Sequence, residues 1–130
     1  MNGQKVVLLC RSATKEQLAF QQQRLIQYAE ENGCEIVAIV GECKSGTSIR
    51  RFKLTMAIRL AHRNQAHILT TDISRVSRLH SVAVKYAKQL CRRAIQLFTM
   101  DEGIGKNQVE NILIYANDAK LGYNPFKSSR

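Results

Sequence analysis

Three polar segments carry the residues in this sequence that are best suited to chemistry. They are residues 11–17, 41–51 and 72–78, and each follows an apolar run of strand length. Six of their cations are candidates for binding an anion: Arg11, Lys44, Arg50, Arg51, Arg75 and Arg78. Guanidinium groups bind phosphate through paired hydrogen bonds and stabilise the negative charge that builds on it during reaction. The segments therefore predict a phosphodiester site that needs neither a metal nor another cofactor.

The elements that must position these segments alternate between strand and helix. Apolar runs predict strands over residues 5–10, 35–40, 66–70 and 94–98, and helical spacing predicts helices over 15–32, 51–63, 79–92 and 107–120. This alternation predicts an α/β fold, a mostly parallel sheet of four to five strands flanked by helices, in one domain over residues 1–130. Such sheets bind ligands beyond the carboxyl ends of their strands, where the three segments fall.

The charge of the chain is concentrated in its middle. Residues 44–93 contain 12 Lys and Arg against one acid, Asp72, a net charge of +11, whereas the remaining residues have 8 basic and 9 acidic side chains, a net charge of −1. A block with charge of one sign repels itself unless a polyanion meets it. The distribution favours nucleic acid as a partner, and we expect Lys44, Arg50, Arg51, Arg75 and Arg78 to contact DNA.

Other classes of protein find little support in the sequence. The longest apolar runs are too short to span a membrane, and the N-terminus lacks the layout of a signal peptide. The four cysteines form no C-x-x-C pair and the histidines share no metal spacing, so we expect reduced thiols, no metal site and a cytoplasmic location. Residues 41–48 lack the lysine that a nucleotide-binding P-loop requires.

Four short motifs, in order along nearly the whole chain, resemble one family. Arg11 closes the first predicted strand, and Thr14-x-x-Gln17 opens the first helix. Residues 42–51 contain an acid, a Ser-Gly pair and an arginine; residues 72–78 read Asp-Ile-Ser-Arg-Val-Ser-Arg; residues 101–104 read Asp-Glu-Gly-Ile before the last helix. In this order and at these separations, the motifs resemble those of the catalytic domain of serine recombinases, the resolvase and invertase family.

The resemblance implies a reaction and a set of roles. In that family a serine hydroxyl attacks a DNA phosphodiester, which gives a 5′-phosphoserine link and a free 3′-hydroxyl, and strands are exchanged in a tetramer without a metal. The family's first arginine and helix-start glutamine match Arg11 and Gln17. Its loop acid, its loop arginine and its last arginine pair match the following residues: Glu42, Arg51, Arg75 and Arg78.

The sequence departs from the family pattern at the residue that matters most. The nucleophile position falls on Ala13, because Arg11 is followed by Ser-Ala rather than by Val-Ser. Loss of the attacking hydroxyl should remove the covalent step. The acid expected before Arg75 is Ser74, the aromatic expected two residues before Arg11 is Leu9, and the family's helix-turn-helix DNA-reading domain is absent from the 130 residues.

Ser12 is the nearest substitute for the missing nucleophile. Side chains alternate along a strand, so Ser12 should face away from the side that Arg11 and Ala13 share, unless a bulge re-aims it. Three hypotheses remain open. The chain is a degenerate recombinase-like domain that binds DNA and self-associates, or an active recombinase that uses Ser12, or a flavodoxin-like small-ligand or signalling domain with no DNA role.

Partners follow from the first two hypotheses. We expect DNA, a homodimer or tetramer, or pairing with a full-length recombinase, and no membrane. The last predicted helix offers an apolar stripe that could form an interface or merely cover the sheet: Val109, Ile112, Leu113, Ala116 and Ala119.

Overall fold

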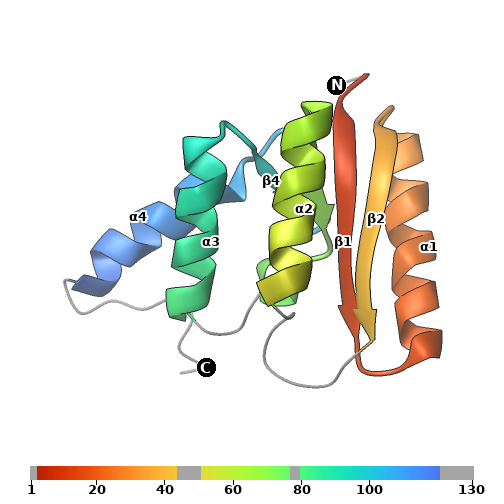
Figure 1. The fold of residues 1–130 in the computed structure, drawn as a ribbon, viewed down its shortest axis with the longest axis horizontal. Coiled ribbons are helices and arrows are strands. Elements are labelled where there is room, and N and C mark those ends of the chain that lie inside the picture. The colour runs from red at the N-terminus through yellow and green to blue at the C-terminus, as the bar shows by residue number, and fades with distance from the viewer. Residues whose placement is uncertain (1–2, 44–50, 77–79, 121–130) are drawn as a thin grey trace.

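The computed structural model describes residues 3–43, 51–76 and 80–120. The elements follow one another as β1 (Lys5–Ser12), α1 (Lys15–Glu31), β2 (Glu35–Cys43), α2 (Arg51–Asn64), β3 (His67–Thr70), a short 3-10 turn η1 (Ile73–Arg75), α3 (His80–Arg92), β4 (Leu97–Thr99) and α4 (Gln108–Lys120). Figure 1 shows the strands running side by side, with their carboxyl ends at the bottom of the view.

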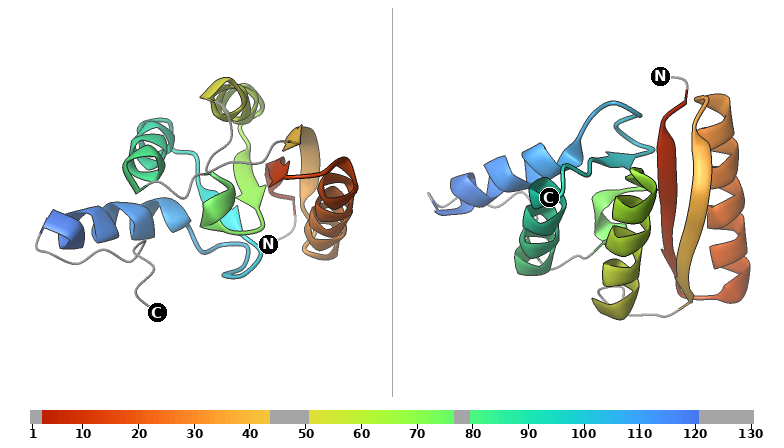
Figure 2. Two further views of the ribbon diagram at one scale, coloured as in Figure 1. Left: turned by 90° about the horizontal axis from the view of Figure 1, so that it is seen from below. Right: turned by 45° about the horizontal axis from the view of Figure 1, so that its top comes forward.

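The described strands form one parallel sheet in the order β2-β1-β3-β4. Helices cover both of its faces: α1 lies on one side, and α2 and α3 lie on the other, as the end-on view of Figure 2 shows. Helix α4 packs against α3 and β4 and extends away from the sheet. The predicted fold class, an α/β parallel sheet flanked by helices, is confirmed.

Alternation along β1 divides the core into two halves. Val7 and Leu9 point toward α2, α3 and α4 and belong to one buried cluster. Val6, Leu8 and Cys10 point toward α1 and pack with Leu25 and Ala29 in a second cluster. The other buried members of this cluster are Leu69 and Phe98. A continuous apolar strand is what burial on both faces of a parallel sheet requires. The parity of a β1 residue therefore decides which helices it meets.

Two strands are longer than the sequence predicted. β1 continues through Arg11 and Ser12, and β2 continues through Gly41, Glu42 and Cys43, which the sequence placed in a loop. The two extensions pair with each other, because Arg11 is in register with Glu42 and Ser12 with Cys43. Polar residues hid these strand ends from a reading based on apolar runs. The fourth strand is also shifted, from the predicted 94–98 to Leu97–Thr99.

The helix boundaries are close to the predicted ones, and the caps explain why. Thr14 accepts a hydrogen bond from the Gln17 amide at 3.1 Å and caps α1 at its start, as its spacing predicted. At the ends of α1, α2 and α3 an amide donates to the carbonyl five residues back, in the pairs Cys34 to Ala29, Ala66 to Ala61 and Ile95 to Leu90. The residue that makes each left-handed turn is Gly33, Gln65 and Ala94, respectively.

Candidate functional site

The candidate site lies where β1 and β2 end, at the lower edge of the sheet in Figure 1. The segment after β3 reaches the same edge, because parallel strands end together. Arg11, Glu42 and Arg75 are therefore brought close in space from three separate parts of the sequence. For two of the predicted residues, Arg51 and Ser74, the structure describes the backbone but not the side chain. Lys44, Arg50 and Arg78 lie outside the described residues.

Arg11 and Glu42 are buried charged residues on neighbouring strands. Arg11 is 5% exposed and Glu42 is 4% exposed. They are register partners in β1 and β2, so they share a face of the sheet, the one covered by α2 and α3 that Leu9 also occupies. Charges are seldom buried to this extent unless opposite charges compensate them. This placement makes Glu42 a counter-charge for the guanidinium of Arg11 at the edge of the site.

Gln21, a residue that the sequence reading missed, holds the end of β1. Its Oε1 accepts a hydrogen bond from the Arg11 amide at 2.9 Å, and its Nε2 donates to the Arg11 carbonyl at 3.0 Å. The same Nε2 donates to the Ser12 Oγ at 3.0 Å. Gln21 is 7% exposed. The signal in the sequence was its place on the apolar stripe of α1, one turn before Leu25, where a glutamine needs buried polar partners.

Gln17 has a different position from Gln21. The resemblance matches the family's helix-start glutamine to Gln17, but this side chain is exposed, and the described contact of the residue is the cap bond that its amide donates to Thr14. Gln21 lies one turn further along α1 and reaches the end of β1. The structure thus places Gln21, rather than Gln17, in contact with the strand that carries Arg11 and Ser12.

Arg75 approaches the same strand end from η1. Its Nη1 donates to the Arg11 carbonyl at 3.2 Å, and its Nε donates to Thr71 Oγ1 at 3.0 Å. Its Nε also lies 3.7 Å from the Asp72 carboxylate. The Arg11 carbonyl thus accepts from both Arg75 and Gln21, which joins β1, α1 and η1 at one peptide unit. The Arg75 side chain is 32% exposed, so part of its guanidinium can meet a phosphate from solvent.

Ser12 lies on the opposite side of the strand from Arg11. It is 8% exposed, has the parity of Cys10 and faces α1, where its Oγ accepts the hydrogen bond from Gln21. The alternation expected from the sequence holds to the end of β1, since the register irregularity between β1 and β2 falls at Val6 and Val7. The hydroxyl is therefore engaged in packing α1 onto the sheet.

Ala13, which the resemblance matches to the family's nucleophile, follows the last residue of β1 and is exposed. Its carbonyl accepts a weak hydrogen bond from the Cys43 Sγ at 3.7 Å. A methyl group can neither attack a phosphate nor hold one. The exposed position next to Arg11 is thus occupied by a side chain without a reactive atom.

Cys10 is the buried thiol nearest to the site. Burial raises its pKa to about 12, and the positive charge of Arg75 opposes that rise. A thiol that stays protonated at neutral pH is a poor nucleophile. Cys10 therefore acts as a small core residue.

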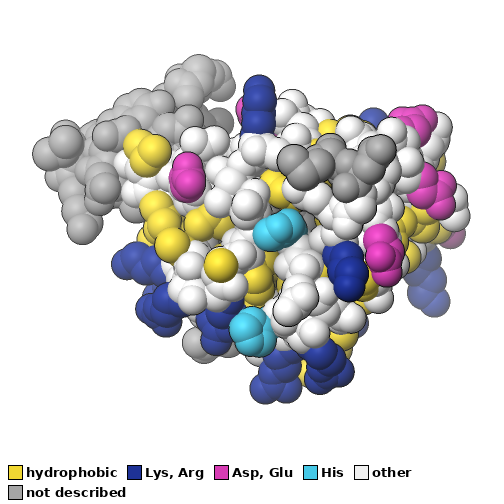
Figure 3. Space-filling model, turned by 90° about the horizontal axis from the view of Figure 1, so that it is seen from above, with side chains coloured by type: hydrophobic (Ala, Val, Ile, Leu, Met, Phe, Trp, Pro, Cys, Tyr) yellow, Lys and Arg dark blue, Asp and Glu magenta, His cyan; other side chains and the backbone are white. Residues whose placement is uncertain are grey.

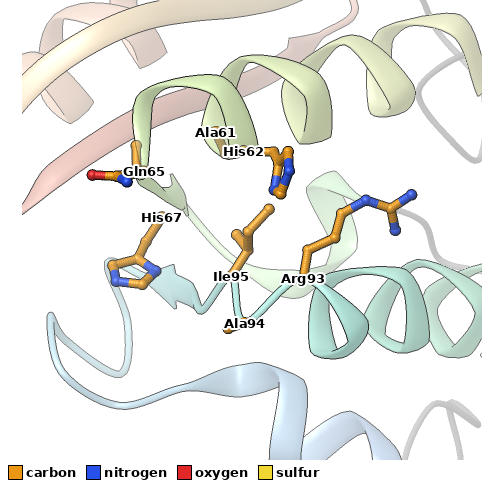
Figure 4. Close-up of a pocket in the computed structure, with 8 residues that line it drawn as sticks. Ala61, His62, Gln65, His67, Arg93, Ala94 and Ile95 are labelled. Atoms are coloured by element: carbon orange, nitrogen blue, oxygen red, sulfur yellow. The ribbon is translucent and has the colours of Figure 1, made fainter.

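A hollow lies at the other end of the sheet from the candidate site, close to the start of β3. It has a volume of about 370 Å³ and is lined by residues that include His62, His67 and Arg93. Figure 4 shows that His67 and Arg93 point away from each other. His67 Nδ1 accepts a hydrogen bond from the Gln96 amide at 2.9 Å, and burial lowers the pKa of the imidazole. The hydrogen bond and the partial burial of the ring give His67 a packing role.

No cluster of three or more His, Cys, Asp or Glu in residues 3–43, 51–76 and 80–120 is arranged to hold a metal ion. None of the helices in the same residues combines the length and the apolar character that crossing a bilayer requires.

Three solved structures of recombinases or of their catalytic domains share this fold. The N-terminal catalytic domain of TP901-1 integrase matches with a TM-score of 0.70 and 17% identity over 92% of this chain and 100% of that one. A resolvase family site-specific recombinase from Streptococcus pneumoniae matches with a TM-score of 0.70 and 22% identity over 92% and 89%. The C-terminal catalytic domain of ISC1926 TnpA, an IS607-like serine recombinase, matches with a TM-score of 0.65 and 18% identity over 90% and 80%. At these identities the matches define the fold, that of a serine recombinase catalytic domain.

The family itself is shown by the sequence. Residues 6–117 match the model of the resolvase N-terminal domain. The search of curated proteins found no match. The chain belongs to the resolvase N-terminal domain family, and the resemblance seen in the four motifs is confirmed at that level.

Proposed function

We propose that this chain is a recombinase-like domain that binds DNA and self-associates but does not carry out the covalent cleavage step. The observation that carries the proposal is the division at the end of β1. The cations Arg11 and Arg75 are in place, whereas Ala13 has no hydroxyl and the Ser12 hydroxyl is buried against Gln21. A nucleophile must reach the phosphorus atom, and a hydroxyl on the α1 side of the strand points to the face opposite the Arg11 side chain.

DNA binding is supported by the charges at the carboxyl edge and by the family. Arg75 is partly exposed beside the end of β1, and the predicted contacts at Lys44, Arg50, Arg51 and Arg78 belong to segments that flank this edge in the sequence. Family membership favours this function over a flavodoxin-like ligand or signalling domain. The two differ in salt dependence, because six to ten phosphate contacts weaken binding by roughly 10³–10⁵ between 50 and 200 mM salt.

Self-association is supported by α4. Val109 and Ile112 of this helix are buried in the core, whereas Ile114 is 54% exposed. The helix extends beyond the sheet in Figure 1, so an apolar residue on its outer side is available to a second copy or to a full-length recombinase. Sedimentation of the protein with Ile114→Glu, compared with wild type, tests this part: the variant should shift toward monomer, and an unchanged distribution would argue against α4 as the interface.

The covalent step is tested directly with a DNA adduct assay. Wild type, Ser12→Ala and Ala13→Ser proteins are incubated with pooled duplexes carrying nicks or mismatches, and the products are separated under denaturing conditions. We expect no protein–DNA adduct from wild type. An adduct from wild type that Ser12→Ala abolishes would overturn the proposal in favour of an active recombinase that uses Ser12, the second hypothesis. An adduct restored only by Ala13→Ser would support it strongly, because the arginine set would then be shown to be competent.

A further inference from the structure

Helices α2 and α3 carry positive charge without any compensating acid. Neither helix contains an Asp or a Glu. Seven cations on or directly after these helices have described side chains, and all but the half-buried Lys53 are exposed: Lys53, Arg59, Arg63, Lys85, Lys88, Arg92 and Arg93. Within the described residues, none of the seven forms an ion pair with an acid. The exposed cations of α2 and α3 therefore form a positively charged surface of the folded domain.

The cations form rows because of helical periodicity. On α3, Lys85, Lys88 and Arg92 follow one another at spacings of three and four residues, which places them on one stripe about 10 Å long. On α2, Arg59 and Arg63 are also four residues apart. The opposite sides of both helices are buried in the core, with Leu54 and Ile58 on α2 and with Tyr86 and Leu90 on α3 among the residues that pack there. The rows consequently face solvent.

The fold sets the two rows beside each other. Both helices cover the same face of the sheet, whereas α1 covers the other face and carries three acids, Glu16, Glu30 and Glu31, with two cations. Figure 3, a view onto the amino-terminal edge of the strands, shows Lys and Arg side chains gathered mainly on the α2 and α3 side and acids mainly on the α1 side. The molecule is thus polarised across its sheet.

This arrangement costs stability in the unbound protein. Like charges at spacings of three and four residues on a helix repel each other, and Lys85–Lys88, Lys88–Arg92 and Arg59–Arg63 are all such pairs. An anionic ligand with regularly spaced charges would remove the repulsion and gain attraction from every member of a row.

We propose that the outer faces of α2 and α3 form a second DNA-contacting surface, which binds the phosphate backbone of duplex DNA without reading its sequence. The proposal rests on the DNA binding inferred above and adds a surface distinct from the carboxyl edge that holds Arg11 and Arg75. Duplex DNA fits better than an anionic membrane, because helices that bind membranes bury a broad apolar side in the bilayer. Most apolar residues of α2 and α3 are packed in or against the core, and Phe52 of α2, which is 65% exposed, is an exception. The surface would hold DNA alongside the domain while the carboxyl edge meets the phosphodiester.

The first test compares two triple variants with the same change of charge. Lys85→Gln, Lys88→Gln and Arg92→Gln remove the α3 row, and Lys5→Gln, Arg24→Gln and Lys106→Gln remove three exposed cations from other parts of the molecule. Affinity for a duplex of random sequence is measured from 50 to 200 mM salt, and circular dichroism verifies that both variants are folded. We expect the α3 variant to reduce the slope of log affinity against log salt by roughly 0.9 for each lost phosphate contact, and the control to change it little. Equal slopes for the two variants would overturn the proposal.

The second test uses two exposed thiols as position markers. Cys91 lies on α3 between Lys88 and Arg92, and Cys43 lies at the carboxyl edge; both are exposed, whereas burial raises the pKa of Cys34 and of Cys10 and slows their labelling. A photoreactive group is attached to Cys91 in a Cys43→Ser background, or to Cys43 in a Cys91→Ser background. Crosslinking of duplex DNA from Cys91 is expected, and crosslinking from Cys43 alone would contradict the second surface.

These experiments separate the two proposals. If wild type does not bind duplex DNA, the proposed function fails and this inference fails with it. If wild type binds DNA and Arg75→Gln lowers the salt slope while the α3 variant behaves like the control, only the second surface is wrong. Wild-type binding to vesicles that contain anionic phospholipid, lost in the α3 variant and unaffected by competing duplex, would assign the surface to a membrane and overturn the inference.

Discussion

The two faces of β1 at its carboxyl end have different roles. On the α1 side, the Ser12 hydroxyl and both backbone groups of Arg11 are bonded to one buried glutamine, Gln21. On the other side, the buried Arg11 side chain shares a face with Glu42. Arg75 reaches the same strand end from η1 and is partly exposed. One side is a packing joint between helix and strand, and the other is a charged edge whose partly exposed member is Arg75.

Under the proposed function, the chain keeps the framework of a reaction site without its reactive atom. A hydroxyl beside the arginines in sequence becomes a packing group when strand alternation turns it toward a helix. The cations do not depend on that hydroxyl, because Arg11 is held by its own strand and Arg75 by Thr71 and the Arg11 carbonyl. The proposed function accordingly separates binding of phosphate from attack on phosphorus.

The largest expected effect is on the packing side. Gln21→Leu keeps the volume of the side chain and removes its three hydrogen bonds, which leaves the buried Arg11 amide without its acceptor. We expect a loss of about 2–3 kcal/mol in the free energy of unfolding, measured by urea denaturation. Gln17→Leu, on the exposed side of the same helix, is the matched control and should change stability by less than about 0.5 kcal/mol. Similar losses for both variants would mean that Gln21 is not a joint.

The next effect is on the charged side. Arg75→Gln removes a partly exposed guanidinium at the strand end and should weaken duplex binding by about tenfold, with a salt slope lower by roughly 0.9. Arg24→Gln, on the exposed surface of α1, removes the same charge and should leave affinity within about twofold. Fluorescence anisotropy with labelled duplex measures both. If the two variants bind equally well, the charged edge is not where DNA lies.

A smaller effect is expected at Ser12 itself. Ser12→Ala removes one of the two bonds that Gln21 Nε2 makes and leaves the other, to the Arg11 carbonyl, intact. Stability should fall by about 1 kcal/mol in urea denaturation, and duplex affinity should stay within about twofold of wild type. Affinity that falls as far as it does in Arg75→Gln would place the Ser12 hydroxyl on the DNA side and contradict its packing role.

The smallest effect comes from the other end of the sheet and separates stability from binding. Ala94 and Gln65 end α3 and α2 with φ of 55° and 52°, a left-handed conformation that costs a residue with a Cβ about 1–2 kcal/mol. Glycine avoids this cost, but it loses more conformational freedom on folding than alanine does, and this loss offsets part of the gain in stability. Ala94→Gly should therefore raise stability by about 0.5 kcal/mol, a gain in Tm of roughly 2 °C, with unchanged DNA affinity. A lower Tm would show that the turn is not strained.

Much of the fold could be predicted from the periodicity of apolar residues and from a helix-capping residue. The apolar runs predicted four strands in their order along the chain, and helical spacing together with the Thr14 cap predicted the helix boundaries to within a few residues. The predictions failed where polar residues continue a strand. Glu42 lies in β2 because its pairing with β1 supplies the hydrogen bonds and the buried neighbour Arg11, and neither is visible from local composition.

The site was predicted unevenly for the same reason. Arg11, Glu42 and Arg75 were identified from motif order, and the opposite directions of Arg11 and Ser12 followed from strand alternation. Gln21 was missed because its partners lie ten residues earlier on another element, and sequence alone could not show that the stripe of α1 carrying it would meet the end of β1.

The sequence by itself determined the alternation of elements, the family and the lack of a hydroxyl at residue 13, because these depend only on residue types and local spacing. The tertiary structure decided what Ser12 does and where the positive charge is displayed. Both depend on which helices cover which face: α1 meets the even residues of β1 and buries Ser12, whereas α2 and α3 share the opposite face and turn their cations outward together.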